Sequence, residues 1–447
     1  MRLDNDPDIG DGQKYAETYR IKYKTRWHPA CQRLRQGMGE LLRSDLFRFL
    51  AGALLLGTAA LTRIAAPNEF LWKVSVAATE GGHWLALAAL LPAIPRGGQR
   101  VLGKLGGFMS LAACALLVFP LYHAQKMNTE LPAKLNSTFG ADKRVRGRFS
   151  EDPRPEPFVV ADVLTSVQSR PVRLEEREFS TTDGEKLTLD VFRPGYEHGP
   201  LPGVLVVHGG SWQNGNSREF VALNGYLAAR DYLVFSVNYR LAPKWKFPAG
   251  RDDVLSAIAY LKVYAKDLGL DSNRLVLLGR SAGGQLALLA AYTANEPAIR
   301  GVISIYAPTD LRFGYDNPAR KQLLDTRGVL EAYLGGSPSK ADDAYFAASP
   351  INFVNATSPP TLLIHGMHDG HVLPEESARL AAKLQQSTVK HLFLQLPWAT
   401  HGCDWSFSGP CGQVTTYAVE QFLDRVTTAP ASKDQPSRLA KNNSPRR

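Results

Sequence analysis

The hydrophobic and polar positions divide the chain into an apolar first third and a longer region of short alternating elements. Three mostly apolar stretches come first, 46–66, 74–94 and 105–124, each close to the roughly 20 residues that a helix needs to cross a bilayer. They predict three transmembrane helices over 46–124. The second stretch contains Glu80 and His83, so an interfacial or buried helix is the alternative there. If it spans, Glu80 needs a polar partner within a small helical bundle.

Beyond residue 171, strand and helix patterns alternate. Alternating stretches on both sides of Thr182-Asp183-Gly184 predict a β-hairpin. Apolar runs of strand length then alternate with helical stretches. The predicted strands are 203–207, 232–237, 274–279, 301–306, 361–365 and 391–396, and the helices are 217–230, 251–266, 283–294, 374–386 and 412–426. This alternation predicts an α/β fold with a mostly parallel sheet and helices on both faces.

These patterns predict five regions along the chain. They are a basic N-terminal segment (1–45), three transmembrane helices (46–124), a polar linker that contains prolines (125–171), an α/β domain (172–427) and a disordered basic tail (428–447). The stretch 309–358 interrupts the alternation and is long for a connection. It is interpreted either as a lid over the site or as a passive helical insertion.

Composition and charge narrow the class of protein. With 44% hydrophobic and 21% charged residues, the chain is typical of folded proteins and not of disordered ones. The net charge of +10 comes largely from Lys and Arg near both ends. No basic stripe with interleaved aromatic residues crosses the middle of the chain, so we expect a membrane and no nucleic acid as partner.

Lys and Arg near the apolar stretches predict the orientation. Placing the N-terminus inside puts nine of these residues on the cytoplasmic side and six on the other, in the direction of the positive-inside rule. Three crossings then place everything after about residue 125 outside the cytoplasm, as in an integral membrane protein with an extracytoplasmic domain. Cys403 and Cys411 bracket a short loop, and a disulfide between them would agree with an oxidising compartment.

A serine lies where a buried strand meets a helix. In Gly279-Arg280-Ser281-Ala282-Gly283, small residues flank Ser281 directly after the run 274–279. Such a tight turn exposes the hydroxyl at a helix N-terminus and is typical of a nucleophile elbow. Serine needs a base and an acid to become nucleophilic.

The chain supplies candidates for both groups in the order serine, acid, base. Asp369 follows the run 361–365, and His401 follows the run 391–396. The spacings are 369 − 281 = 88 and 401 − 369 = 32 residues, which leaves room for an insertion and a strand-helix-strand unit. Asp404, three residues after His401, is the alternative acid, although it does not end a strand.

Glycines after the strand 203–207 supply a candidate oxyanion hole. Gly209 and Gly210 lie in His208-Gly209-Gly210-Ser211-Trp212, where residues without bulk let a substrate approach backbone N–H groups. We expect the amides of Gly209, Gly210 and Ala282 to hold the developing negative charge. Trp212, Trp245 and Trp405 are candidates either for the substrate pocket or for ordinary core packing.

Taken together, these motifs resemble those of the α/β-hydrolase superfamily, and most of all the hormone-sensitive-lipase-like and feruloyl-esterase-like carboxylesterases. The resemblance covers about residues 172–427 and rests on HGGSW (208–212), NYRLAP (238–243), FPAGRDD (247–253), GRSAGG (279–284), ASPINFV (348–354) and PPTLLIHGMHD (359–369). It implies hydrolysis of small-molecule esters without a cofactor. Arg280 stands where an acidic residue is common in the lipase-like branch, and Ser211 replaces a third glycine, so the substrate stays open.

Three other interpretations compete with ester hydrolysis. His365, His368 and His371 could be mistaken for a metal site, but no second ligand cluster accompanies them, and we expect no metal. An amide hydrolase of the arylformamidase type shares the HGG-x-W loop. A non-enzymatic membrane scaffold could retain the fold, although a complete set of serine, acid and base counts against it.

Overall fold

The computed structural model describes residues 44–95, 100–141, 143, 150–196 and 199–428. Nearly all of the predicted basic segment and tail therefore lies outside the described residues. The chain divides into two compact units: residues 1–57 with 87–114, and residues 58–86 with 115–447. The candidate site residues all belong to the second unit.

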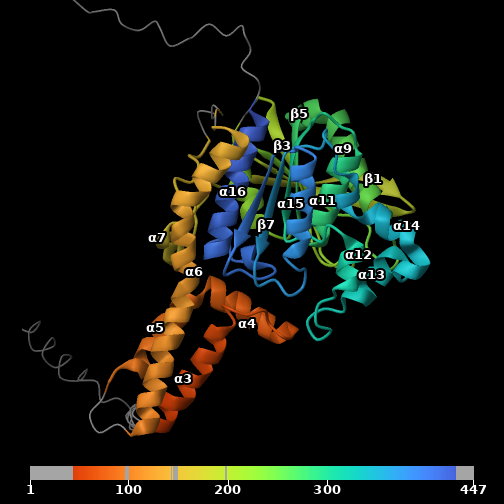
Figure 1. The fold of residues 1–447 in the computed structure, drawn as a ribbon. Helices are drawn as coiled ribbons and strands as arrows, with labels where there is room; N and C mark the ends of the chain where they lie inside the picture. The colour runs from red at the N-terminus through yellow and green to blue at the C-terminus, as the bar shows by residue number, and fades with distance from the viewer. Residues whose placement is uncertain (1–43, 96–99, 142, 144–149, 197–198, 429–447) are drawn as a thin grey trace, which may run out of the picture. The chain divides into compact units, whose positions relative to one another are not determined.

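An eight-stranded sheet in the order β1-β2-β4-β3-β5-β6-β7-β8 forms the centre of the second unit (Figure 1). The strands are β1 (Arg173–Thr182), β2 (Glu185–Arg193), β3 (Leu201–Val207), β4 (Leu233–Val237), β5 (Leu270–Arg280), β6 (Ile299–Ile305), β7 (Thr361–Gly366) and β8 (His391–Leu396). β1 and β2 form the predicted hairpin, with Asp183 and Gly184 at positive φ in its turn. β2 pairs antiparallel with β4, and all later pairs are parallel. The predicted α/β fold is confirmed.

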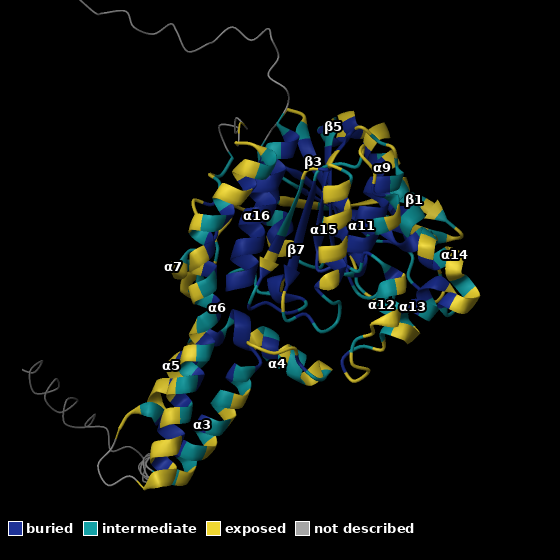
Figure 2. Cartoon of the chain, viewed as in Figure 1, coloured by how far each residue is buried: buried dark blue, intermediate teal, exposed yellow. Residues whose placement is uncertain are grey.

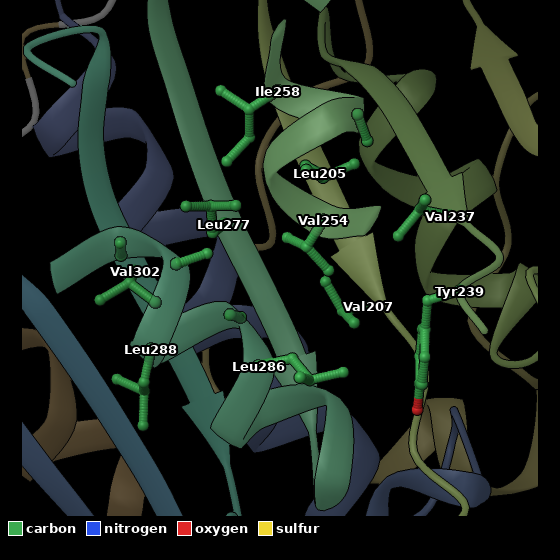
Figure 3. Packing of buried hydrophobic residues seen from close by; sticks show 14 of the residues in the cluster. Leu205, Val207, Val237, Tyr239, Val254, Ile258, Leu277, Leu286, Leu288 and Val302 are labelled. Atoms are coloured by element: carbon green, nitrogen blue, oxygen red, sulfur yellow. The ribbon is translucent and has the colours of Figure 1, made fainter. Parts of the chain in front are cut away.

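Helices cover both faces of the sheet. They are α8 (Val221–Ala228), α9 (Ala249–Val263), α10 (Ala265–Leu268), α11 (Ala282–Thr293), α15 (Glu375–Gln386) and α16 (Pro410–Thr427). In β3, Leu205 and Val207 point into a core formed with α9, α11 and α15 (Figure 3). Val204 and Val206 point into the opposite core, formed with α8 and α16. This alternation buries the central strands from both sides (Figure 2).

The insertion between β6 and β7 is helical. It contains α12 (Leu311–Asp316), α13 (Thr326–Leu334), α14 (Pro338–Ala348) and the short 3-10 helix η1 (Pro350–Phe353). Two other short elements are α7 (Val160–Thr165) and η2 (Cys403–Trp405). Leu330, Tyr333 and Tyr345 of the insertion are buried in the core beside α11, which fixes it to the sheet.

Close helix packing characterises the first unit. It contains most of α3 (Asp45–Ala60), the end of α5 (Gly82–Ala93) and the start of α6 (Val101–Phe139). A Cβ added to Gly52 would lie 2.4 Å from the Gly106 carbonyl oxygen, so α3 and α6 approach closely through glycines. Arg48 is buried and donates to the carbonyl of Ile94 at 2.9 Å. Small residues at the contact thus let the helices approach closely, and backbone carbonyls satisfy the buried guanidinium.

The stretch 74–94, predicted as one transmembrane helix or as an interfacial or buried helix, does not form a single helix. The stretch forms the end of α4 (Glu69–Glu80) and α5, and these helices meet at Gly81 with a bend of 86°. The reason is polar: a carboxylate oxygen of Glu80 accepts the N–H of Cys411 at 2.9 Å, which holds the end of α4 against α16. Among the described helices, only α6 is long and apolar enough to cross a membrane by itself, and the bent pair qualifies only as one broken span.

The predicted linker 125–171 also differs in the structure, because α6 runs past residue 124 to Phe139. Its Ala124, Leu131 and Leu135 are fully buried in the core that contains α16. Residues 125–139 are therefore part of the packed unit. Arg154, later in the predicted linker, donates to Gln413 of α16 at 2.7 Å. The chain around Arg154 is therefore also attached to the packed unit.

Candidate active site

Ser281 occupies the sharp turn between β5 and α11, with φ 51° and ψ −124°. Such a φ is costly for a residue with a side chain and persists only where its surroundings enforce it. A Cβ on Gly279 would lie 2.2 Å from the Gly283 carbonyl oxygen, and one on Gly283 would lie 2.1 Å from that of His208. Both flanking positions therefore require glycine, and the turn has the geometry of a nucleophile elbow.

His401 and Asp369 meet Ser281 at the carboxyl edge of the sheet. Nε2 of His401 lies 3.1 Å from Oγ of Ser281, and its Nδ1 lies 2.7 Å from Oδ2 of Asp369. A carboxylate only accepts hydrogen bonds, so the ring proton belongs on Nδ1 and Nε2 is left to accept the serine hydroxyl. The structure thus brings together three side chains that are 88 and 32 residues apart.

Asp369 is buried, and donors surround its carboxylate. Its Oδ1 accepts the backbone N–H groups of His371 at 2.8 Å and Val372 at 3.0 Å. Nε2 of His365 lies 3.2 Å from Oδ2. Burial alone would raise the pKa of Asp369, but the charge of His401 and hydrogen bonds from His365 and His401 outweigh it and lower the pKa well below its ordinary value. The carboxylate is therefore ionised at neutral pH.

The loop after β3 carries the predicted oxyanion residues next to Ser281. A Cβ on Gly209 would lie 3.4 Å from Cβ of Ser281. Gly210, Ser211 and Trp212 have φ of 101°, 54° and 59°, which turns the loop sharply. Within the described part of the chain, the N–H groups of Gly209, Gly210 and Ala282 donate to no acceptor. They lie where an oxyanion hole is expected.

A cavity of about 860 Å³ opens over Ser281 and His401. Most of its wall is apolar and comes from the loop after β3, the insertion and the loop after β7. The apolar residues include Val221, Leu311, Phe313, Leu324, Leu330 and Leu373. Trp212 and Trp405 also line the cavity, whereas Trp245 does not. A site of this size and lining can accept a sizeable apolar group.

Three aromatic neighbours of His401 were not predicted from the sequence. Tyr306 lies 4.5 Å from the His401 ring, and His371 stacks on it at 5.0 Å, measured between ring centroids. Trp72 of α4 donates from Nε1 to the backbone carbonyl of His401 at 2.9 Å. His371 follows Asp369 by two residues and could have been suspected. No sequence pattern connects Trp72 with a residue 329 positions away.

The histidines around Asp369 have separate contacts. His365 bonds through Nδ1 to the Ser377 hydroxyl at 2.8 Å, and His371 stacks on His401. Burial lowers the pKa of His371 to about 4, so its ring is neutral at pH 7. In the described ranges, no three His, Cys, Asp or Glu side chains converge as metal ligands.

The sequence of this chain is similar to those of known esterases. The profile of the family described as BD-FAE matches residues 189–384. Esterase LipC of Mycobacterium tuberculosis is 32% identical over 248 residues, which are 51% of this chain and 59% of LipC. Ethyl acetate hydrolase of Pseudomonas putida is 31% identical over 250 residues, 54% of this chain and 78% of that protein. The chain thus spans little more than half of LipC but most of the Pseudomonas protein.

Solved structures agree with the fold. A structure titled bacterial heroin esterase superposes with a TM-score of 0.51 at 23% identity, covering 60% of this chain and 89% of that one. At this identity the likeness concerns the fold alone. The family match begins at residue 189, so α3 to α6 lie outside it.

Proposed function

Because this chain belongs to the carboxylesterases of the α/β-hydrolase superfamily, we propose that it hydrolyses carboxylic esters through Ser281, His401 and Asp369. The observation that carries the proposal is the continuous pair of contacts on His401, 3.1 Å to Ser281 and 2.7 Å to Asp369. Serine alone is a weak nucleophile, and a base oriented by a carboxylate removes that limit.

The geometry supports acyl transfer in two halves. As Oγ of Ser281 attacks the ester carbonyl, its proton moves to Nε2 of His401, and Asp369 stabilises the resulting imidazolium. The leaving alcohol takes that proton as the carbon–oxygen bond breaks, which leaves an acyl-serine. Water then attacks the acyl carbon and gives a proton to Nε2 of His401; the bond to Oγ of Ser281 breaks, Oγ takes that proton, and the acid is released.

The three unpartnered amides support stabilisation of the tetrahedral intermediate. Gly209, Gly210 and Ala282 present N–H groups beside Ser281, and Ala282 begins α11. Its amide has no partner within the helix, and the helix N-terminus adds positive potential. Donors already in position need no reorganisation when the oxyanion forms, so they lower the barrier to attack.

We propose substrates with a sizeable apolar acyl or alcohol group. The cavity of about 860 Å³ has a mostly apolar wall. Trp405, which is 70% exposed at the rim, presents flat apolar surface, whereas Trp212 is buried in the wall and stacks on Tyr333 at 4.3 Å. Each additional methylene group that a substrate buries against such a wall should strengthen its binding by about 0.8 kcal/mol.

We also propose that the enzyme is anchored in a membrane by α3, α5 and the first half of α6, with the hydrolase domain outside the cytoplasm. The apolar start of α6, the glycine contact between α3 and α6 and the satisfied burial of Arg48 support the anchor. The disulfide between Cys403 and Cys411 supports an oxidising location.

A fluorophosphonate probe and a graded set of esters test the proposed reaction. The wild-type protein should be labelled and should hydrolyse p-nitrophenyl esters, with kcat/KM rising from acetyl toward longer chains. Ser281→Ala should lose both properties, whereas Ser256→Ala, at an exposed serine of α9, should keep them. Equal labelling of wild type and Ser281→Ala would favour the non-enzymatic scaffold. Faster turnover of formylated anilines than of every ester would favour the amide hydrolase.

A further inference from the structure

The segment 58–80, which precedes the family match, contacts the candidate catalytic histidine directly. The indole N–H of Trp72 donates to the carbonyl oxygen of His401 at 2.9 Å. The Trp72 ring also meets His371 edge-on, with 4.6 Å between centroids and 65° between planes. Because His371 in turn stacks on His401 at 5.0 Å and 24°, Trp72 reaches both the backbone and the ring plane of His401.

Asp369 holds the imidazole of His401, but the backbone of His401 lies outside the helices and strands. It lies in the turn between β8 and η2 and is followed by Gly402 at φ 70°. Within the described residues, its carbonyl accepts no hydrogen bond other than that from Trp72. The indole therefore restrains the peptide group between His401 and Gly402. Rotation of this peptide would move the imidazole of His401 relative to Ser281.

Several other contacts fix the position of Trp72. The side chain of Asn68 caps α4 by accepting the N–H of Leu71 at 2.9 Å, which sets the helix start one turn before Trp72. The N–H of Glu69 donates to the Gln322 carbonyl at 3.2 Å, in the insertion. At the other end of α4, Glu80 accepts the N–H of Cys411, and Cys411 is joined to Cys403 beside His401.

We infer that Trp72 is a positioning residue for His401, so that the segment 58–80 is part of the active site as well as the approach to the membrane. This inference rests on the proposed function. Trp72 touches no reacting atom; it acts by holding His401 at hydrogen-bonding distance from Ser281. Misplacement of a base lowers the rate of proton transfer and has little effect on the binding of a small substrate.

A wall role alone would have a different signature. Trp72 also lines the cavity, so shortening it enlarges the space available to a long acyl chain. That change would raise or lower KM for long esters and leave the reaction of a small ester unchanged. The two roles therefore separate on p-nitrophenyl acetate and on a small fluorophosphonate, which do not fill the cavity.

The experiment compares Trp72→Phe with Trp84→Phe in the full chain. Phenylalanine keeps a flat apolar ring at position 72 and removes the N–H, and Trp84 offers the same substitution at an exposed position outside the cavity wall. For Trp72→Phe, we expect the fluorophosphonate labelling rate and kcat on p-nitrophenyl acetate to fall about tenfold, the size of one lost hydrogen bond. KM should stay within about twofold. Trp84→Phe should match the wild type.

An isosteric variant protects the test against misfolding. Incorporation of 3-benzothienylalanine at position 72 preserves the shape of indole and deletes only the N–H, and it should show the same loss of kcat. Unchanged labelling and kcat in both Trp72 variants, or a change in KM alone, would overturn the inference while the wild type still reacts. Failure of the proposed function is distinguishable, because the wild type itself would then be labelled no faster than Ser281→Ala.

Discussion

Asp404 is bound to Arg280 and not to His401: its Oδ2 lies 2.6 Å from Nε of Arg280, and both residues are buried. Its other oxygen accepts the Tyr306 hydroxyl at 2.5 Å. Asp404 follows His401 by only three residues, yet its carboxylate faces Arg280, the residue after Gly279 of the elbow. The unusual Arg280 of the GRSAGG motif thus has a dedicated counter-charge, and Asp369 is left as the acid that contacts His401.

Asparagine at each of the two acids should separate their roles. Asp369→Asn should lower kcat by about 10³- to 10⁴-fold with little change in unfolding temperature, because an amide favours the wrong imidazole tautomer. Asp404→Asn should instead cost about 3 kcal/mol of stability by leaving Arg280 buried without a charge partner. Steady-state kinetics and thermal unfolding of both variants provide the check. A large loss of kcat in Asp404→Asn alone would assign the orienting role to Asp404.

Sequence patterns predicted the hydrolase domain well because its signals are local. Strands β3 to β8 each contain an apolar run bounded by turn residues, β1 and β2 alternate, and Asp183-Gly184 permits the positive φ values of the hairpin. Ser281, Asp369 and His401 each follow a strand, and parallel strands bring their carboxyl ends to one edge. Local patterns were therefore sufficient to find side chains that meet only in the folded protein.

The N-terminal third was harder to predict because its contacts are distant. Glu80 accepts a hydrogen bond from a backbone amide 331 residues away. The hydropathy of residues 74–94 cannot predict this contact. The end of α6 is a different case. Ala124, Met127, Leu131 and Leu135 recur at helical spacing and are buried, so the period of an amphipathic helix was present in a stretch interpreted as a polar linker.

Alanine at Gly210 should disable the oxyanion loop. Its φ of 101° is unfavourable for alanine, and the added Cβ would lie 2.1 Å from the Asn214 carbonyl oxygen, so the loop must shift away from Ser281. We expect kcat to fall by about 10²-fold or more, as when an oxyanion donor is lost. Gly199→Ala is the matched control, since its Cβ would meet nothing within 4 Å. Equal activity of the two variants would remove Gly210 from the proposed site.

Glu376 should make stability depend on pH. Burial raises its pKa to about 8 from an ordinary 4.5, although N–H groups of Thr309 and Asp310 partly oppose the shift. Below pH 4.5, Glu376 is protonated in both the folded and the unfolded protein, and its full contribution to the free energy of unfolding is present. It is lost as pH rises toward 8, because the unfolded chain ionises first.

Glu376→Gln should remove this dependence. Glutamine can accept the same two N–H groups, at 2.9 and 2.8 Å in the wild type, but it cannot ionise. Between pH 4.5 and 8, the wild type should lose up to about 1.4 kcal/mol of unfolding free energy per pH unit relative to the variant. Denaturant unfolding at several pH values measures the difference. Parallel curves for the two proteins would show that Glu376 is ionised in the folded state.

The Cys403–Cys411 bond links stability to the proposed location of the domain. It closes a loop with a sequence separation of 8 residues directly after His401, and a loop of that length is worth about 2.5 kcal/mol on chain-entropy grounds. If the domain faces an oxidising compartment, protein extracted from native membranes should contain the bond, and reduction should lower its unfolding temperature and its esterase activity together. The double variant Cys403→Ser, Cys411→Ser should resemble the reduced protein and be insensitive to reductant.

The opposite location has its own signature. The domain would lie in the cytoplasm if freshly isolated membranes contained two alkylatable thiols at 403 and 411 and a reporter fused after residue 430 were active in the cytoplasm.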